Sequence, residues 1–392
     1  MTKLETLIRK LCSDGVVFVK LGDVLGYEQP TKYIVKCKEY QDKGLPVLTA
    51  GQTFILGYTD EQDGIFEASK ENPVVIFDDF TTSFHWVDFN FKVKSSAMKM
   101  LRVQSKKEVS FRFVYYAMKC IKYQTLEHSR QWISKYSQIE IPLPPIEVQT
   151  EIVRILDKFT SLQAELEAEL DCRKRQYEYY RDKLLSFENV GGQDVEWKKI
   201  GDFCDTLSGF PFESSKFQYS GIKLMRGKNV KRGYFDFNEE DDRYWESSEG
   251  LEKYLLQDGD IIISMDGSLV GKSFAMLKEE HLPLLLVQRV ARVRAIGVNQ
   301  KYLYHNISNG FSKYVDTKKT GGAIPHVSMK DIQNFEIPVP SLQEQERIAN
   351  ILDRFESLTT SLTAGLPAEI AARRQQYEHY RDKLLTFKRK SA

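Results

Sequence analysis

Residues 139–162 read IEIPLPPIEVQTEIVRILDKFTSL, and residues 335–358 read FEIPVPSLQEQERIANILDRFESL. The two copies close with related endings, QYEYYRDKLLSF at 176–187 and QYEHYRDKLLTF at 376–387. Each copy begins with an Ile-Pro-x-Pro turn and continues with apolar residues at helical spacing. A repeat of this length predicts that the segments in front of the copies are also equivalent. The chain therefore reads as unit, long helix, unit, long helix.

The composition is that of a globular protein. The chain has 392 residues, of which 42% are hydrophobic and 28% charged, enough for two or three domains with proper cores. No apolar run approaches the ~20 residues that span a bilayer, and residues 1–12 lack the apolar segment of a signal peptide. These features predict a cytosolic protein without membrane contact. Because the formal net charge is only +1, any contact with nucleic acid requires local positive charge.

The segments in front of the helical copies have strand-like periods. A short amphipathic helix is expected at 3–12, and VVFVKLGD, LPVLTAG, PVVIF, WVDFNFKV and KMLRV then read as strands between turns. VVFVKLGD pairs with VEWKKIGD, LPVLTAGQTFILGY with IKLMRGKNVKRGY, and PVVIFDD with DIIISMDG in the second unit. Between these anchors the units differ widely. Similar strands with dissimilar loops are expected of one fold that carries two different readout surfaces.

The apolar positions of the helical copies follow the 3-4 spacing of a coiled coil. The expected seam residues are Ile152, Phe159, Leu162, Tyr177, Tyr180, Ile348, Phe355, Leu358, Tyr377 and Tyr380. Because the four tyrosines recur at seam spacing in both copies, we expect them to pack rather than to stack on bases. The endings place four charges on outer faces, either solvated or as a docking surface for another subunit: Arg181, Asp182, Arg381 and Asp382.

The second helical copy is longer than the first. Asp157 aligns with Asp353 at an offset of 196, whereas Tyr177 aligns with Tyr377 at an offset of 200, so the second copy has four extra residues. Four residues are about one helical turn, which preserves the apolar stripe. The insertion contains Gly365-Leu366-Pro367, and an interior proline costs roughly 3 kcal/mol unless it begins a new helix. The sequence leaves open whether the helix is kinked or split there.

The common catalytic signatures are absent from the sequence. DGSLVGKS at 266–273 has only three residues between Gly267 and Gly271, one fewer than a phosphate loop of nucleotide hydrolases requires. A glycine-rich loop after a strand, near DNA phosphates in its functional version, is the alternative, with Ser268 and Lys272 as candidate contacts. The histidines have no metal-ligand spacing, the five cysteines form no CxxC pair, and no methyl-donor motif is present. We therefore expect a binding or scaffold protein with no catalytic residue and no metal site.

Two stretches combine residues suited to DNA. In the second unit, a basic cluster precedes the acidic run NEEDDR, which suggests one face for phosphates and another for solvent; the alternative is a solvated basic loop. In the first unit, residues 79–86 combine hydroxyl, imidazole and indole groups, or else form a strand-turn-strand with Trp86 in the core. Hydroxyls and amides read bases, whereas lysine and arginine mainly neutralise phosphates. The candidates are Thr81, Thr82, Ser83, His85, Lys92, Lys94, Arg226, Lys228, Asn229, Lys231, Arg232 and Tyr234.

The helical copies, the opening LETLIRKLCSDGVVFVKLGD (4–23) and the paired endings RDKLLSF and RDKLLTF resemble the specificity subunit of type I restriction-modification enzymes. The resemblance covers essentially the whole chain, and it is least specific in the recognition domains. It implies an α+β fold in which two β-rich target-recognition domains are separated by two long antiparallel coiled-coil helices. Each domain would read one half of a bipartite, asymmetric DNA site. Helices of roughly 40 residues would be about 60 Å long, enough to hold two domains on successive major-groove faces of one duplex.

The resemblance also implies partners and cofactors. A specificity subunit has no catalysis of its own and binds double-stranded DNA and two modification subunits, which use S-adenosylmethionine. The complete complex adds restriction subunits, which use ATP and Mg²⁺. The family's glycine loop before an Ile-Pro-His turn matches GGAIPH at 321–326, whereas the first unit has SRQW at 129–132. We therefore extend the DNA role of this loop only to the second unit, to Lys318, Lys319, Thr320, Gly321 and His326.

The resulting domain organisation has four segments. Residues 1–145 form the first recognition domain with its N-terminal helix, 146–190 the first helical region, 191–340 the second recognition domain, and 341–392 the second helical region. The alternative is a non-catalytic coiled-coil scaffold whose β-rich units bind proteins rather than DNA.

Overall fold

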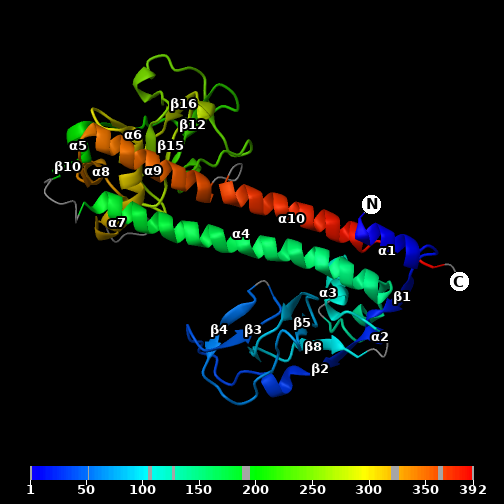
Figure 1. Cartoon of the computed structure of the whole chain (residues 1–392). Helices are drawn as coiled ribbons and strands as arrows, with labels where there is room; N and C mark the ends of the chain where they lie inside the picture. Colours follow the sequence, from blue (N-terminus) through cyan, green and yellow to red (C-terminus); the bar gives the residue numbers. More distant parts are fainter. Residues whose placement is uncertain are drawn as a thin grey trace. The chain divides into compact units, whose positions relative to one another are not determined.

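The computed structural model describes residues 2–51, 53–104, 108–125, 129–187, 195–318, 326–360 and 365–390. The chain divides into two compact units (Figure 1), Met1–Glu167 with Ile370–Ala392, and Ala168–Glu369. Each unit holds one β-rich domain together with the parts of the long helices that pack on it. Among the described helices, none is long and apolar enough to cross a membrane.

The β-rich domain of the first unit contains two small sheets. The antiparallel four-stranded sheet has the order β2–β8–β5–β6, with the strands Leu25–Glu28, Met98–Val103, Val74–Asp78 and Phe84–Val87. The other sheet has the order β4–β3–β7, with the strands Ile55–Thr59, Leu45–Leu48 and Lys92–Val93, and β3 and β7 are parallel. A separate antiparallel pair, β1 (Val17–Lys20) with β9 (Glu140–Leu143), leads into the Ile-Pro-x-Pro turn.

The second unit repeats this arrangement strand for strand. Its four-stranded sheet has the order β11–β17–β14–β15, with the strands Cys204–Ser208, Val290–Ala295, Ile261–Ser264 and Phe274–Met276. Its three-stranded sheet has the order β13–β12–β16, with the strands Tyr244–Trp245, Ile222–Met225 and Leu284–Leu286, and β12 and β16 are parallel. The pair β10 (Trp197–Lys199) with β18 (Glu336–Pro338) matches β1 with β9. The predicted internal repeat is confirmed, because the paired runs place β1 with β10, β3 with β12 and β5 with β14. One part of the predicted pairing is wrong: ILGY lies in β4, whereas its predicted partner KRGY (231–234) lies ahead of β13.

The central strands β5 and β14 contain the unbroken apolar runs 74–77 and 261–263 because both of their faces are covered. Val75 and Phe77 belong to one hydrophobic cluster, and Val74 and Ile76 to another. The isoleucines of β14 divide between two clusters in the same way. Since side chains alternate between the faces of a strand, a strand buried on both sides needs an unbroken apolar run. This is why PVVIF and DIIIS lack the alternation of a half-exposed strand.

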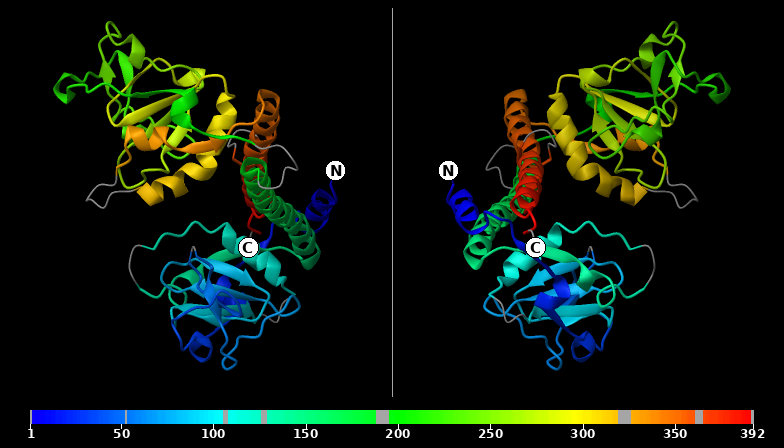
Figure 2. Two further views of the ribbon diagram at one scale, coloured as in Figure 1. Left: turned by 90° about the vertical axis from the view of Figure 1, so that its left-hand side faces the viewer. Right: turned by 90° about the vertical axis from the view of Figure 1, so that its right-hand side faces the viewer.

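Short helices cover the sheets and fill the connections of both units. In the first unit they are α1 (Lys3–Leu11), α2 (Leu21–Val24) and α3 (Phe111–Lys119). In the second unit they are α5 (Ile200–Phe203), α6 (Gln300–Asn306), α7 (Ser312–Lys318) and α8 (Met329–Gln333). Helix α1 begins at a capping box of Thr2 and Glu5 and buries Leu4. The start of the first long helix lies beside α1 (Figure 2), and Leu4 joins its residues Val148 and Ile152 in one hydrophobic cluster of the first unit.

The helical copies form α4 (Ile146–Ser186), α9 (Leu342–Thr360) and α10 (Gly365–Leu384). In the first unit, Phe159 of α4 stacks on Tyr380 of α10, with ring centroids 5.6 Å apart. In the second unit, Tyr180 of α4 stacks on Phe355 of α9 at 5.8 Å. The same phenylalanine–tyrosine contact is therefore made twice by equivalent positions, and the two helical copies run antiparallel.

Near the β-rich domains, several of the predicted seam residues point inward. Ile152 and Ile348 are buried, and Tyr177 and Tyr377 pack against the cores of their units. The prediction is wrong for two positions toward the middle of the helices. Leu162 is 40% exposed and Leu358 is 47% exposed, because neither belongs to the clusters that hold the helices to their domains.

The insertion splits the second helical copy, which resolves the alternative that the sequence leaves open. Helix α9 ends at Thr360 and α10 begins at Gly365, whose φ is +76°. A side chain there would clash, because an added Cβ would lie 2.7 Å from the carbonyl oxygen of Ser357. Pro367 falls in the first turn of α10, where backbone N–H groups have no partner inside the helix. The proline is therefore compatible with the new helix.

A glutamine joins each β-rich domain to its long helix. Gln149 accepts a hydrogen bond from the backbone N–H of Ser110 (2.9 Å) and donates one to the carbonyl of Pro144 (2.8 Å). In the second unit, Gln345 makes the same two contacts, with Asn299 (2.8 Å) and with a proline carbonyl (2.8 Å). Both glutamines are 1% exposed. The repeated Ile-Pro-x-Pro turn thus serves to present a carbonyl to this side chain.

We expect Gln149→Leu and Gln345→Leu each to destabilise the protein by about 1–3 kcal/mol, because the substitution leaves an N–H and a carbonyl at the partly buried joint without partners. Chemical denaturation of the variants measures the loss. Thr150→Ala, at an exposed position of the same helix, is the control. Glutamine variants as stable as the control would show that the joint does not depend on these hydrogen bonds.

Candidate nucleic-acid interface

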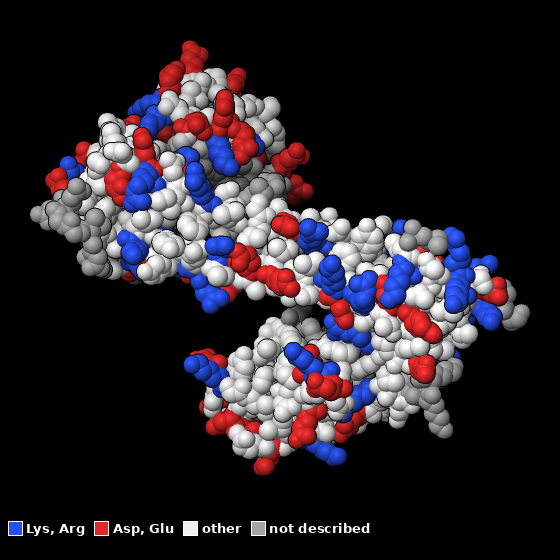
Figure 3. All heavy atoms as spheres, in the orientation of Figure 1, with Lys and Arg blue, Asp and Glu red and all other residues white. Residues whose placement is uncertain are grey.

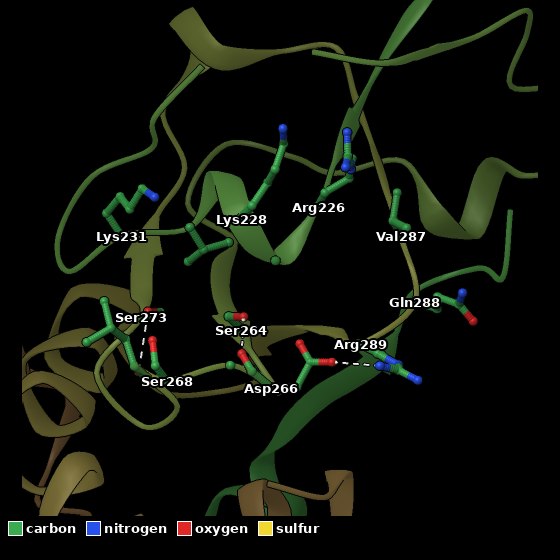
Figure 4. Close-up of a pocket in the computed structure, with 14 residues that line it drawn as sticks. Arg226, Lys228, Lys231, Ser264, Asp266, Ser268, Ser273, Val287, Gln288 and Arg289 are labelled. Carbon is green, nitrogen blue, oxygen red and sulfur yellow. Dashed lines mark hydrogen bonds and ion pairs between the residues drawn. The ribbon is translucent and has the colours of Figure 1, made fainter. Parts of the chain in front are cut away.

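The second unit contains a polar hollow of about 500 Å³. Four segments of the chain meet there: the turn after β12, the loop after β14, the start of β15 and residues 287–289 (Figure 4). Four of the residues predicted from the sequence line it, namely Arg226, Lys228, Lys231 and Ser268. In the close-up, Arg226 and Lys228 lie on one side, and Ser264, Asp266 and Arg289 on the other. Cationic and hydroxyl groups therefore share one concave surface.

The turn after β12 is held by an asparagine that we predicted as a DNA contact. Asn229 is 3% exposed, its Oδ1 accepts the N–H of Arg226 (3.2 Å) and its Nδ2 donates to the carbonyl of Asp236 (3.0 Å). The prediction for Asn229 is wrong, because its polar atoms are used within the protein. The asparagine instead fixes the turn that carries Arg226 and Lys228 into the hollow.

The acidic run after the basic cluster does not face elsewhere, as the sequence suggested, but folds back on it. Lys228 pairs with Asp241 at 2.8 Å, and Lys231 lies 3.7 Å from Asp236. Arg226 donates to the carbonyl of Asp241 at 3.2 Å. The hydrogen bond from Lys228 lowers the pKa of Asp241, so this carboxylate is ionised at neutral pH. Acidic and basic side chains are interspersed over this domain (Figure 3). A bound polyanion must therefore compete with the carboxylates of the domain for its lysine and arginine side chains.

The glycine-rich loop after β14 forms part of the hollow. Gly267 and Gly271 have φ values of +103° and +81°, and Gly271 packs so closely on Val315 that an added Cβ would lie 2.8 Å from it. Ser268 is exposed and lines the hollow, whereas Lys272 is exposed outside it. The loop is therefore shaped by glycine for a tight turn against α7.

The remaining candidates of the second unit lie outside the lining of the hollow. Arg232 and Tyr234 are exposed, and Lys318 lies over the ring of Tyr314 at 5.7 Å. His326 is exposed, and its backbone bridges to Asp266 at the end of β14. This bridge brings the end of the 318–326 loop beside the hollow. Lys319, Thr320 and Gly321 lie outside the described residues.

Sequence reasoning missed five polar residues of the hollow: Ser264, Asp266, Ser273, Gln288 and Arg289. Arg289 pairs with Asp266 at 3.1 Å. A signal for two of them was present, because Gln288 and Arg289 interrupt the apolar run from LPLLLV to VARV. A polar pair between two buried strands marks a connection at the surface, and loops at the surface carry function.

The predicted loop of the first unit is a strand-turn-strand between β5 and β6, as in the alternative reading of the sequence. The carboxylate of Asp78 accepts the N–H groups of Phe80 (2.9 Å) and Thr81 (2.8 Å). The hydroxyls of Thr81 and Ser83 are 2.5 Å apart at the surface. Thr82 is buried, which removes it from the candidate contacts and makes that prediction wrong.

Two further candidates of the first unit are structural. Lys92 is 1% exposed and pairs with Glu61 at 2.9 Å. The backbone N–H of Cys37 and then the Lys92 ammonium lower the pKa of Glu61 to about 2. Lys92 is therefore no phosphate contact, and its prediction is wrong. His85 is half-buried, contacts the carbonyl of Gly51 at 2.9 Å, and has its pKa lowered by burial. Lys94 is exposed.

The two arginines of the helical endings are less exposed than predicted. Arg181 and Arg381 each bond the next aspartate, and their guanidinium groups lie over Tyr177 and Tyr377 at 5.6 and 5.7 Å. Their side chains are 20% and 16% exposed, because the tyrosine rings cover them. Asp182 and Asp382, in contrast, are 62% and 51% exposed.

Among the described residues, one group of three potential metal ligands lies close together, His305, Asp353 and Glu356, with ligand atoms within 4.8 Å. His305 and Asp353 already contact each other at 2.8 Å, and Lys301 pairs with the same aspartate at 2.7 Å. The equivalent aspartate of the first unit, Asp157, accepts from an arginine and a tyrosine of α3. Because an aspartate holds the domain at this place in both units, we assign the group to that joint. The five cysteines are unpaired.

The fold and the hollow define a class of protein: two β-rich domains with one strand order and different loops, each packed on the long helices of its own unit. The family model of the type I restriction modification DNA specificity domain matches the chain twice, at residues 13–171 and 192–372. The chain belongs to this family. Each match spans one recognition domain and most of the helix that follows it, in agreement with the repeat.

Relatives and solved structures agree with this assignment. The chain is 43% identical over 404 residues to the EcoR124I/EcoR124II specificity subunit of Escherichia coli, covering 99% of this chain and 98% of the relative. It is 29% identical over 412 residues to a putative type I specificity subunit of Haemophilus influenzae, covering 99% and 100%. The crystal structure of the S subunit from M. genitalium has the same fold, with a TM-score of 0.61 at 14% identity over 95% of this chain and 96% of that one.

Proposed function

We propose that the chain is the DNA-recognition subunit of a type I restriction-modification complex. Each β-rich domain reads one half of a bipartite, asymmetric site on double-stranded DNA. The observation that carries this proposal is the repeat: one strand order occurs twice, and the segments between the matching strands differ in sequence. Two copies of one framework with different loops suit two different sequences.

In the second domain, different residues of the hollow contact the phosphates and the bases. Arg226, Lys228 and Lys231 neutralise phosphates, and the hydroxyl of Ser268 reaches base edges or sugar. In the first domain, the surface hydroxyls of Thr81 and Ser83 take the reading role, with Lys94 as a phosphate contact. The two domains thus present different donors and acceptors, as an asymmetric site requires.

The helix pair sets the gap between the half-sites and receives the partner subunits. The pseudo-twofold repeat offers two equivalent docking surfaces, which suits two modification subunits. The exposed leucines Leu162 and Leu358 and the exposed carboxylates Asp182 and Asp382 occur in equivalent pairs on these surfaces. Restriction subunits join through this assembly. S-adenosylmethionine, ATP and Mg²⁺ belong to the partners in this proposal, and the chain itself carries no catalytic residue.

The proposal is tested by selection from random-sequence duplex DNA. The complex of this chain with its modification subunits is incubated with the library, and the retained duplexes are sequenced. We expect one motif with two specified parts and a gap of constant length. The modification subunits without this chain are the control. Retention without any enriched sequence would favour the alternative of a coiled-coil scaffold that binds proteins.

Releasing Lys228 from its carboxylate should strengthen binding to every sequence. We expect Asp241→Asn to raise the affinity roughly two- to fivefold and to steepen the salt dependence by up to about 0.9 in the logarithmic slope. The affinities of the complex for duplexes with and without the motif, measured over a range of salt, test this. Asp258→Asn removes an exposed carboxylate outside the hollow and is the control. Equal effects of both substitutions would show a change in net charge rather than competition at Lys228.

A further inference from the structure

The connection between β16 and β17 is fixed by backbone hydrogen bonds on three sides. The N–H of Val287 donates to the carbonyl of Met225 (3.1 Å), and that of Gln288 to Phe210 (2.9 Å). The carbonyl of Arg289 accepts the N–H of Met265 (3.0 Å). The connection is therefore anchored to three other segments of the domain. The backbone positions of its residues are therefore fixed, unlike those of a surface loop without such hydrogen bonds.

Arg289 has an unusual backbone conformation for its residue type. Its φ is +63°, in the left-handed region that residues with a side chain adopt at a conformational cost. The side chain is 69% exposed, so its own burial does not offset that cost. Glycine would suit the backbone better. An exposed arginine at such a position points to a role for the guanidinium group itself.

Asp266 restricts the direction of this guanidinium. Its Oδ2 lies 3.1 Å from Nη1 of Arg289 (Figure 4), and its side chain is only 23% exposed. The segment around Asp266 is held in turn, because its carbonyl accepts the hydroxyl of Ser264 (3.2 Å) and its backbone bridges to His326. An aspartate that is itself held can orient the arginine before any ligand arrives.

The ion pair suits a base edge better than a phosphate. A carboxylate 3.1 Å from the guanidinium opposes much of its charge, which weakens attraction to another anion. The binding of a neutral base edge is weakened less by the neighbouring carboxylate. It also benefits because the guanidinium group already points in a fixed direction. The guanidinium has only donors, so it selects acceptors. Guanine presents two acceptors, O6 and N7, at the spacing of the arginine fork in the major groove.

We propose that Arg289 reads a guanine in the half-site bound by the second domain, and that Asp266 is its positioning residue. The proposal rests on the proposed function and deepens it. The cations across the hollow, Arg226 and Lys228, hold the flanking phosphates and bring the base edge to Arg289. The contact requires that the hollow faces the major groove of the duplex.

The test uses the complex of this chain with its modification subunits, carrying Arg289→Ala, Arg289→Lys or Asp266→Asn. The probes are duplexes of the selected motif in which each base pair is changed in turn. We expect Arg289→Ala to lose roughly 5- to 150-fold discrimination at one G·C pair of one half-site. Arg289→Lys should retain part of it, because lysine lacks the planar fork. Asp266→Asn should lose preference at the same base pair, to a smaller extent.

Arg289→Gly separates reading from folding. Glycine accepts the positive φ without strain, so this variant should melt at or above the temperature of the wild type. It should nevertheless lose the guanine preference. Lys313→Ala, which removes an exposed cation of α7 outside the hollow, is the control for charge and should retain every base preference.

Uniform weakening of all sequences by the Arg289 variants, with a salt slope reduced by about 1, would overturn the proposal and assign Arg289 to a phosphate. Unchanged discrimination at every base pair would also overturn it. Failure of the wild-type complex to select any sequence is a different result, which would contradict the proposed function itself.

Discussion

Deleting residues 364–367 is expected to change the preferred gap between the two half-sites while each half-site sequence is retained. The first helical copy lacks these residues and forms the continuous helix α4, whereas the second is split at Gly365. Removal of four residues shortens a helix by about 6 Å, or roughly two base-pair steps. At the original gap, one half-site would then be out of register. Loss of even two base-pair contacts lowers affinity at least roughly 30-fold.

The deletion is compared with a variant of unchanged length. Pro367→Ala keeps every residue position and removes only the proline, so its preferred gap should be that of the wild type. Sequencing of methylated sites from cells that carry each variant with its partner subunits gives the gap directly. The same gap and the same affinity after the deletion would contradict the role of the helix pair as a spacer.

Replacing Lys228, Lys231 and Arg232 together with alanine is expected to weaken binding to all duplexes at least roughly tenfold and to lower the salt slope by up to about 2.7. Two of these cations line the hollow, and Arg232 is exposed nearby in the sequence. Their pairing with Asp236 and Asp241 reduces the effect below the full value. Equilibrium affinity measured against salt concentration, with and without the motif, gives both quantities.

The matched control removes three lysines of the same domain that lie outside the hollow: Lys253, Lys278 and Lys313. Its salt slope should change much less, although the net charge changes equally. If the variant without Lys228, Lys231 and Arg232 instead lost preference at a single base pair, with the salt slope unchanged, these cations would be base readers.

The framework was predictable because it depends on periodicity, which is a local property. The unbroken apolar runs of β5 and β14 follow from burial on both faces, and each run stands in the sequence whatever the rest of the chain does. Because the sequence repeats, the strands predicted in one unit could also be predicted in the other. Even the split at Gly365 had a local cause, in a glycine and a proline within one turn.

Individual contacts were less predictable, because they depend on segments that are distant in sequence. Lys92 looked like a surface cation, but Glu61 lies beside it in the folded domain. Whether the basic cluster is free to bind phosphates depended on the position of the acidic run, which the sequence does not determine. In the structure, Lys228 pairs with Asp241 of that run. Arg289 gave only a weak signal, since its role depends on its φ and on Asp266, which lies beside it only in the folded domain.

The sequence of the methylated motif is the decisive measurement of what this chain recognises. A cell that carries this chain with its modification subunits is sequenced for methylated adenine, beside a cell that lacks only this chain. If each β-rich domain reads one half-site, we expect methylation in one asymmetric motif with two specified parts and a constant gap, present only with the chain. A single uninterrupted motif, or methylation that does not depend on the chain, would contradict it.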